Sequence, residues 1–521
     1  MKIKHIFLSV TAIAVIFASA SAQTGAGDSE FKEHVRRQRA EFERFKQQTQ
    51  TDFNNYRDSV NREYAAFLEQ KWKVFDMRKE DPPIKTPVPV PPVYDPASPR
   101  PAPEKVPVIT PPLPLLPPPN PQPKPEPAKP DSPDSPDSPV SPSKPVRDRK
   151  PQPEPLQYPV KIEFFGTPVA LKRLSSPSLK PLPGVSEKDV ASYWSLLSKQ
   201  PHEEWSNEIW RVKTELGLND WGMYLLINKL FKVYFPSGTA NEQVIFTVFM
   251  LNQSGYRARV GRNQNELVPL IAFQQKVYYM YFFRYGEGDN TVRYSALNPQ
   301  HKDLSAIRSC EIDFPGATRN LDMRIETSPH LTNSLRSSTT EFGRNTCTIN
   351  YNRNLVDFYS TYPCVDFPVY AGAPLDPVTL QSIESQVGQD IRDRSQEEGV
   401  NLLLHFVQQA FRYKTDTEQF GHERWLFAEE TVASPFSDCE DRSILFAQLA
   451  RRILGMQTVL IHYPGIHVAT AVKFDNRQTD GDHIIVNGTK YLICDPTYTG
   501  ANLGTAMPDL KNVKVEVFPI N

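Results

Sequence analysis

One of the five cysteines, Cys439, lies just before the apolar run that begins at Ile444. Ser437 is followed three residues later by Glu440, a spacing typical of a capping box that opens a helix. Cys439 is then expected in the first helical turn, where free backbone N–H groups and the positive end of the helix dipole stabilise a thiolate. The alternative is an inert core thiol, since cysteine is often buried. The acidic neighbours of Cys439 favour the nucleophile.

A nucleophilic thiol needs a base, and the base needs a group that orients it. His467 opens one apolar run (468–474), and Asp495 closes another (491–494). An Asn487-Gly488 pair between apolar segments is typical of a β-hairpin turn, so Asp495 should lie at a strand end near the His467 ring. Two alternatives stay open: His467 as a structural histidine, and Asp495 as a turn former before Pro496.

Three segments together resemble the transglutaminase-like cysteine enzymes. They are SDCEDRSILFAQLARRILG (437–455), YPGIHVATAV (463–472) and YLICDPTY (491–498), and the resemblance covers about residues 398–510. It implies Cys439 as nucleophile, His467 as base and Asp495 as orienter. It also implies an α+β, papain-like core in which the cysteine helix packs on an antiparallel sheet. One departure is Ile466, which separates Gly465 from His467 where many relatives have Gly-His.

The implied reaction is attack of the Cys439 thiolate on an amide carbonyl of a peptide or protein. The acyl group then passes to water, as in a cysteine peptidase or amidase, or to an amine, as in a crosslinking transglutaminase. Hydrolysis is favoured because relatives of bacterial type are often hydrolases. An envelope scaffold that uses the same fold without chemistry is the third alternative. No cofactor and no metal are expected, since the chain has no His-Glu-x-x-His, Cys-x-x-Cys or phosphate-binding Gly-Lys-Ser/Thr motif.

The N-terminus has the features of a secretory signal peptide. Lys2 and Lys4 precede an apolar run (6–20), and Ala20-Ser21-Ala22 is a small-residue cleavage signal, so residues 1–22 are expected to be removed. The protein is therefore predicted to be exported, to the periplasm, the cell surface or the medium, with no membrane span after cleavage. Its net charge of −1 argues against a nucleic-acid partner.

Residues 23–80 are predicted to form one long helix, because aromatic residues recur every eleven positions and eleven residues make three helical turns. We expect this aromatic stripe to mediate self-association, as in a coiled coil, or contact with the cell envelope through residues 31–75. The two series are Phe31, Phe42, Phe53, Tyr64, Phe75 and Phe45, Tyr56, Phe67. Residues 81–158 are proline-rich and predict an extended polyproline II spacer or tether.

The globular part predicts an internal repeat. Residues 243–255 align with 443–455 at an offset of 200, and 294–299 align with 491–496. In the first copy the nucleophile position is Thr239 or Ala240, the orienter position is Asn298, and no histidine lies between them. We therefore predict a degenerate copy (159–303), a β-rich connection (304–372) and a catalytic copy (373–521). The alternative is two unrelated α/β domains.

The other cysteines have different predicted environments. Cys494 alternates with Leu492 and is expected in the core. Two of the remaining three could pair in an oxidising compartment, and the sequence does not say which: Cys310, Cys347 and Cys364.

Overall fold

The computed structural model describes residues 28–82, 160–172, 179–297, 304–392, 394–474 and 479–520. The predicted signal peptide (1–22), nearly all of the predicted spacer (83–158) and Asn298 lie outside these residues. The chain divides into two compact units, residues 1–65 and 66–521. Among the helices that the structure describes, none combines the length and the apolar character that a membrane crossing requires.

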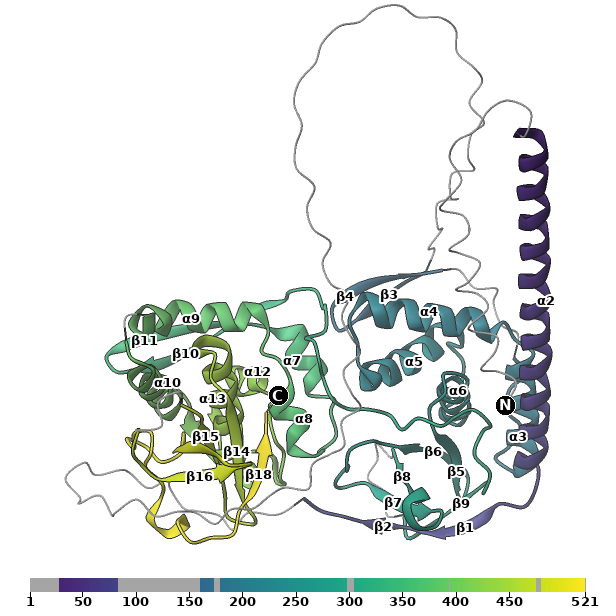
Figure 1. Cartoon of the computed structure of the whole chain (residues 1–521). Coiled ribbons are helices and arrows are strands. Elements are labelled where there is room, and N and C mark those ends of the chain that lie inside the picture. Colours follow the sequence, from purple (N-terminus) through teal and green to yellow (C-terminus); the bar gives the residue numbers. More distant parts are fainter. Residues whose placement is uncertain are drawn as a thin grey trace, which may run out of the picture. The chain divides into compact units, whose positions relative to one another are not determined.

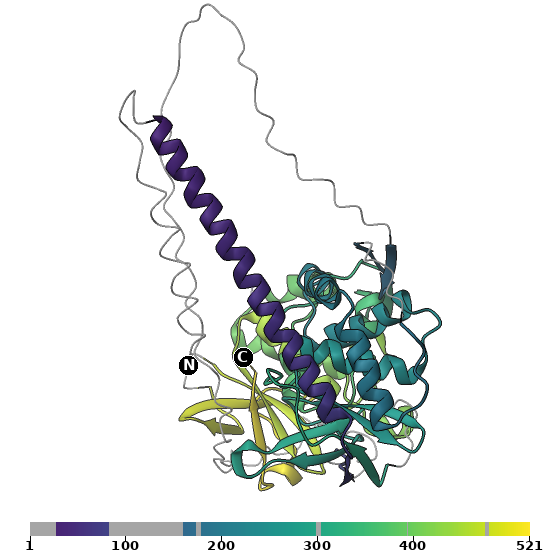
Figure 2. The same cartoon turned by 90° about the vertical axis from the view of Figure 1, so that its right-hand side faces the viewer.

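The N-terminal helix α2 runs from Asp28 to Leu68 without a glycine or proline (Figure 2). Three residues of the aromatic stripe are well exposed on it: Phe42 (45%), Phe45 (54%) and Tyr56 (63%). The helix is shorter than the predicted range of 23–80. Beyond it the chain forms two short strands, β1 (Lys73–Asp76) and β2 (Arg78–Lys79).

The reason for the shorter helix is that the segment after it pairs with strands distant in sequence. β1 is antiparallel to β9 (Ala306–Ser309), and β2 is antiparallel to β7 (Tyr281–Tyr285). Phe75, which the eleven-residue series places on the helix, is a β1 residue whose ring stacks on Phe283 at 4.2 Å between centroids. Sheet pairing and this contact outweigh the local helical pattern.

The first globular core combines four helices with a seven-stranded antiparallel sheet in the order β1-β9-β5-β6-β8-β7-β2 (Figure 1). Its other strands are β5 (Ala258–Asn263), β6 (Glu266–Ala272) and β8 (Val292–Ala296). The helices are α3 (Glu187–Ser198), α4 (His202–Glu215), α5 (Asp220–Tyr234) and α6 (Ala240–Gln253). A separate hairpin, β3 (Val160–Phe164) and β4 (Thr167–Leu171), precedes them.

The second core has a five-stranded antiparallel sheet in the order β16-β17-β15-β14-β18. Its strands are β14 (Thr458–Tyr463), β15 (His467–Val472), β16 (His483–Val486), β17 (Thr489–Cys494) and β18 (Glu516–Pro519). Helix α13 (Cys439–Leu454) packs against β14 and β15 (Figure 1). Helices α9 (Pro377–Arg392) and α10 (Gln396–Ala410) pack against α13. The α+β class is thus confirmed.

The two cores share one strand order. After helix α6 the strands β5 to β9 are arranged as β9-β5-β6-β8-β7, and after helix α13 the strands β14 to β18 are arranged as β18-β14-β15-β17-β16. When β5 to β9 are matched in chain order with β14 to β18, the two arrangements are the same. The first residue of α6 is Ala240 and the first of α13 is Cys439. By its place at the start of the helix, Ala240 is the counterpart of Cys439.

The region between the cores is less uniformly β than predicted for 304–372. It contributes β9 to the seven-stranded sheet and forms a hairpin of β10 (Leu335–Phe342) and β11 (Asn345–Asn352). Helices α7 (Arg353–Tyr359) and α8 (Phe367–Gly372) follow. Helix α7 begins there because the Asn352 side chain accepts a hydrogen bond from Asn354 N, which caps the helix. All five cysteines are free thiols, so no pair forms among Cys310, Cys347 and Cys364.

Candidate active site

Helix α13 places Cys439 at its first position, but its cap differs from the predicted one. The N-cap residue is Asp438, and Asp441 Oδ2 accepts a hydrogen bond from Asp438 N at 3.3 Å. Ser437 cannot cap the helix because it is the last residue of β13 (Phe436–Ser437), which pairs with β12 (Arg412–Tyr413). The helix starts one residue later than the Ser437-Glu440 pattern predicts, and Cys439 remains in the first turn.

Two hydrogen bonds tie the cysteine helix to the histidine strand. Ser443 Oγ donates to the carbonyl of Val468 at 3.0 Å, and Thr470 Oγ1 donates to the carbonyl of Ser443 at 3.2 Å. All of these groups are buried. Because buried hydrogen bonds are costly to break, they fix the start of β15, and with it His467, beside the first turns of α13.

Asp495 follows directly on β17, whose position depends on the predicted hairpin. Asn487 and Gly488 both have positive φ, 49° and 75°, and join β16 to β17, so the hairpin prediction is confirmed. Asp495 Oδ2 lies 2.8 Å from Nε2 of His467. Its Oδ1 accepts from the backbone N–H groups of Thr497 at 2.9 Å and Tyr498 at 3.2 Å. Asp495 therefore both forms a turn and contacts the histidine.

His467 also lies near the thiol of Cys439, which contributes to the raised pKa of the imidazole. Because Nε2 faces Asp495, Nδ1 is the ring nitrogen that remains for the thiol. Burial by itself would lower the pKa of His467, but the charges and hydrogen bonds of Asp495 and Cys439 raise it to about 10. The three side chains are deeply buried, with exposures of 2% for Cys439, 4% for His467 and 2% for Asp495. An imidazolium held against a sulfur atom is the arrangement that activates thiols as nucleophiles.

Gln408, which the sequence did not single out, holds the loop that carries Asp495. From helix α10 its Nε2 atom lies 3.1, 3.0 and 3.1 Å from the backbone carbonyls of Asp495, Tyr498 and Ala501. Its Oε1 accepts from Gly500 N at 3.0 Å. The only signal in the sequence is that Gln408 stands among apolar residues such as Phe406 and Val407, where a buried amide must find partners.

Arg442 is a second residue that sequence reasoning missed. It is 2% exposed, and its guanidinium donates to Ser437 Oγ at 3.1 Å and to the carbonyl of Phe411. Burial lowers the pKa of Arg442, whereas the nearby Tyr413, Asp438 and Cys439 raise it. The group is thus a buried cation one helical turn from the thiol.

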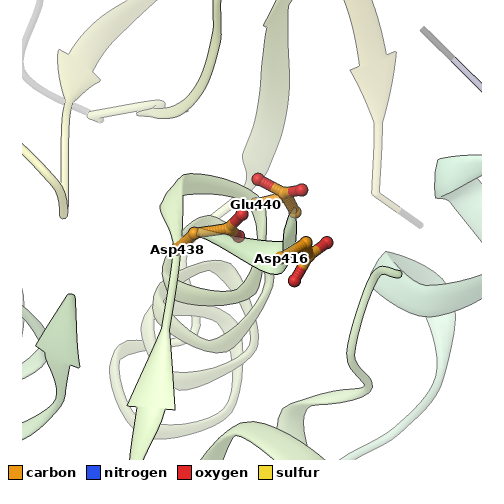
Figure 3. Close-up of side chains that lie close together, drawn as sticks. All are labelled: Asp416, Asp438 and Glu440. Carbon is orange, nitrogen blue, oxygen red and sulfur yellow. The ribbon is translucent and has the colours of Figure 1, made fainter. Parts of the chain in front are cut away.

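The acidic neighbours of Cys439 are buried rather than exposed. Carboxylate oxygens of Asp416, Asp438 and Glu440 lie within 4.8 Å of one another (Figure 3). Cys439 Sγ donates to Glu440 Oε2 at 3.1 Å. Oxygen donors of this kind suit a hard cation such as Ca²⁺. Three carboxylates so close together can be buried only if protons or cations offset part of their charge.

The long connection before the nucleophile contacts the same helix start. It contains α11 (Asp416–Phe420) and α12 (Ala428–Ala433). Arg424 N donates to Asp416 Oδ2 at 2.7 Å, and Leu426 N donates to Asp441 Oδ1 at 2.9 Å. These bonds position residues 424–426 beside the first turn of α13.

Cys494 lies in β17 and is fully buried, and burial raises the pKa of its thiol. The two cysteines of this core thus have different surroundings, since Cys439 lies near His467 and Cys494 does not. No protein-family model matches the chain, and no curated protein matches its sequence significantly.

Proposed function

We propose that the protein is an exported, thiol-dependent enzyme that transfers acyl groups from amide bonds of peptides or proteins, with hydrolysis as its main outcome. The observation that carries the proposal is that Cys439 at the start of α13, His467 at the start of β15 and Asp495 just after β17 come together, with His467 Nε2 at 2.8 Å from Asp495 Oδ2. The resemblance of residues 398–510 to transglutaminase-like cysteine enzymes assigns the same three residues. The second core is accordingly proposed to be a transglutaminase-like, papain-like fold.

In the proposed reaction the Cys439 thiolate attacks the amide carbonyl and forms a tetrahedral oxyanion. Backbone N–H groups of the first turn of α13 lack intrahelical acceptors and point toward the developing charge. The His467 imidazolium then gives its proton to the leaving amine, and the acyl group remains on sulfur as a thioester. Neutral His467 next takes a proton from water, which attacks the thioester and releases the acid. Asp495 keeps the ring oriented and stabilises its charge throughout.

The first core is proposed to be a copy of the second that has lost the chemistry. Its support is the common strand order together with Ala240 at the position of Cys439. A methyl group cannot act as a nucleophile. His467 is the first residue of β15 and pairs with Tyr463 of β14. In the first core, Glu266 is the first residue of β6 and pairs in the same way with Asn263 of β5. Glu266 therefore stands at the position of His467. This copy is expected to support the active one or to hold substrate.

The decisive experiment incubates the purified protein with a peptide library and an added primary amine. Cleaved, deamidated and amine-linked products, separated by mass, identify the acyl acceptor. Cys439→Ala should lower product formation to background, whereas Cys347→Ala, which removes a thiol of the β10–β11 hairpin, should leave it unchanged. Full activity of Cys439→Ala would exclude the proposed nucleophile. Absence of any product with the wild-type protein would favour the non-catalytic scaffold.

A further inference from the structure

A cavity of about 290 Å³ lies beside the loop that precedes the nucleophile. Its lining is rich in aromatic side chains and comes mostly from residues 278–281, 359–370 and 422–425, together with Lys79, Ala296 and Glu430. Neither Cys439 nor His467 lines it. The side chains that matter for the argument are Tyr278, Tyr279, Tyr281, Tyr362, Tyr370 and Trp425.

Trp425 lines this cavity and carries an unused hydrogen-bond donor. Its ring is 3% exposed and stacks on Phe367 with 3.9 Å between centroids. Its indole Nε1 atom is buried and has no hydrogen-bond partner among the residues that the structure describes. Buried indole N–H groups nearly always have an acceptor. A ligand of this cavity is therefore expected to bring a hydrogen-bond acceptor, such as a carbonyl.

Tyr279 is held rigidly at the same cavity. Its backbone N–H donates to the carbonyl of Glu80 at 2.8 Å, and its hydroxyl oxygen accepts from Glu423 N at 3.1 Å. The hydroxyl proton of Tyr279 stays available as a second donor. Aromatic rings with a few fixed donors are the surface that binds polyproline II segments, because proline has no N–H and presents only carbonyls and apolar rings.

The chain itself supplies such a segment close in sequence to a residue that lines the cavity. Lys79 lines the cavity, and the described part of the chain stops at Pro82, three residues later. The sequence that follows, PIKTPVPVPPVYDPASPRPAP (83–103), has nine prolines in 21 residues. No long tether is needed to bring it to the cavity, so its effective concentration there is high.

We propose that this aromatic cavity binds proline-rich peptide in the extended polyproline II form, and that its occupant is residues 83–103 of the same chain. The carbonyls of the segment accept hydrogen bonds from Trp425 Nε1 and the Tyr279 hydroxyl, while its proline rings pack on the tyrosines. The inference is independent of the proposed acyl transfer, because it uses none of the reacting groups.

The test uses the full chain with the photoreactive amino acid benzoylphenylalanine in place of Val88, at high dilution. Irradiation should yield intramolecular cross-links to residues 278–281, 359–370 or 422–425. The matched control carries the same group at Val140, far along the proline-rich region, and should give at least about tenfold fewer of these cross-links. Equal yields from both positions, or cross-links to other parts of the chain, would overturn the proposal.

Two further measurements separate binding from misfolding. Trp425→Phe keeps an aromatic ring on Phe367 and removes only the N–H donor, so the cross-link yield should fall roughly fivefold, as for one lost hydrogen bond. With the wild-type pocket, a synthetic peptide of residues 83–103 should compete, and the same peptide with alanine for proline should not. Competition by both peptides would refute proline recognition. Cross-links found only in a dimer would assign the pocket to the segment of a second copy instead.

Discussion

Gln408 on helix α10 donates a hydrogen bond to the backbone carbonyl of Asp495 at 3.1 Å, across 87 positions of sequence. The same amide holds Tyr498, Ala501 and Gly500. Replacement by leucine leaves these buried groups without a partner, which costs about 1–3 kcal/mol. Gln408→Leu should therefore lower the free energy of unfolding in urea and reduce kcat.

The matched control for this prediction is Gln409→Leu on the same helix. Gln409 is exposed and accepts one hydrogen bond, from Gly343 N at 3.2 Å. Its replacement should change the free energy of unfolding by less than about 0.5 kcal/mol. If both variants lose the same stability, the amide of Gln408 has no special role in holding the Asp495 loop.

Asp495→Asn tests the orienting role of the carboxylate. The amide fits the same space but cannot stabilise the imidazolium, so kcat should fall by about 10²- to 10⁴-fold with a smaller change in KM. The exposed Asp509→Asn is the control and should retain activity. Circular dichroism of both variants shows whether the fold is kept. A fully active Asp495→Asn protein would remove this residue from the mechanism.

The raised pKa of His467 predicts how stability varies with pH. Its value is about 10 in the folded protein and 6.5 ordinarily, so folding favours the protonated ring. The stabilisation is complete below pH 6.5 and is lost as the pH rises through 10. The difference in free energy of unfolding between wild type and His467→Gln should thus shrink between these values. A difference that grows with pH would contradict the assignment of an imidazolium.

The two cysteines of the second core should differ in reactivity. Cys439 lies near His467, whose raised pKa keeps a positive charge beside the sulfur, whereas burial raises the pKa of Cys494. Iodoacetamide at pH 6 should therefore modify Cys439 first, as measured by mass spectrometry of peptides over time. His467→Gln should slow the labelling of Cys439 and leave Cys494 unchanged. Equal, slow labelling of both thiols would favour a non-catalytic scaffold.

The exposed aromatic residues of α2 predict self-association. Replacing Phe42, Phe45 and Tyr56 by serine removes large apolar surfaces and should shift the protein toward monomers in sedimentation velocity. Serine at the exposed Gln47 and Gln48 of the same helix is the control and should not change the sedimentation coefficient. If the wild-type protein is monomeric at high concentration, the stripe serves a different partner.

Local patterns in the sequence were sufficient where the structure depends on neighbouring residues. The Asn487-Gly488 pair predicted the β16–β17 hairpin because both residues tolerate positive φ. The eleven-residue period predicted α2, since no glycine or proline interrupts it. Cys439 was predicted in the first turn of a helix even though the cap proved to be Asp438.

Tertiary structure decided the features that depend on partners far along the chain. Ser437 lies in a strand because it pairs with Tyr413. Phe75 lies in β1 and not in the helix, and its ring stacks on Phe283. The support that Gln408 gives to Asp495 is invisible in sequence, since nothing near position 408 indicates which carbonyls it will meet. The sequence by itself determined which residue types could react and roughly where the elements lie. Packing decided which of them meet, because burial and long-range hydrogen bonds outweigh the small free energies of local preference.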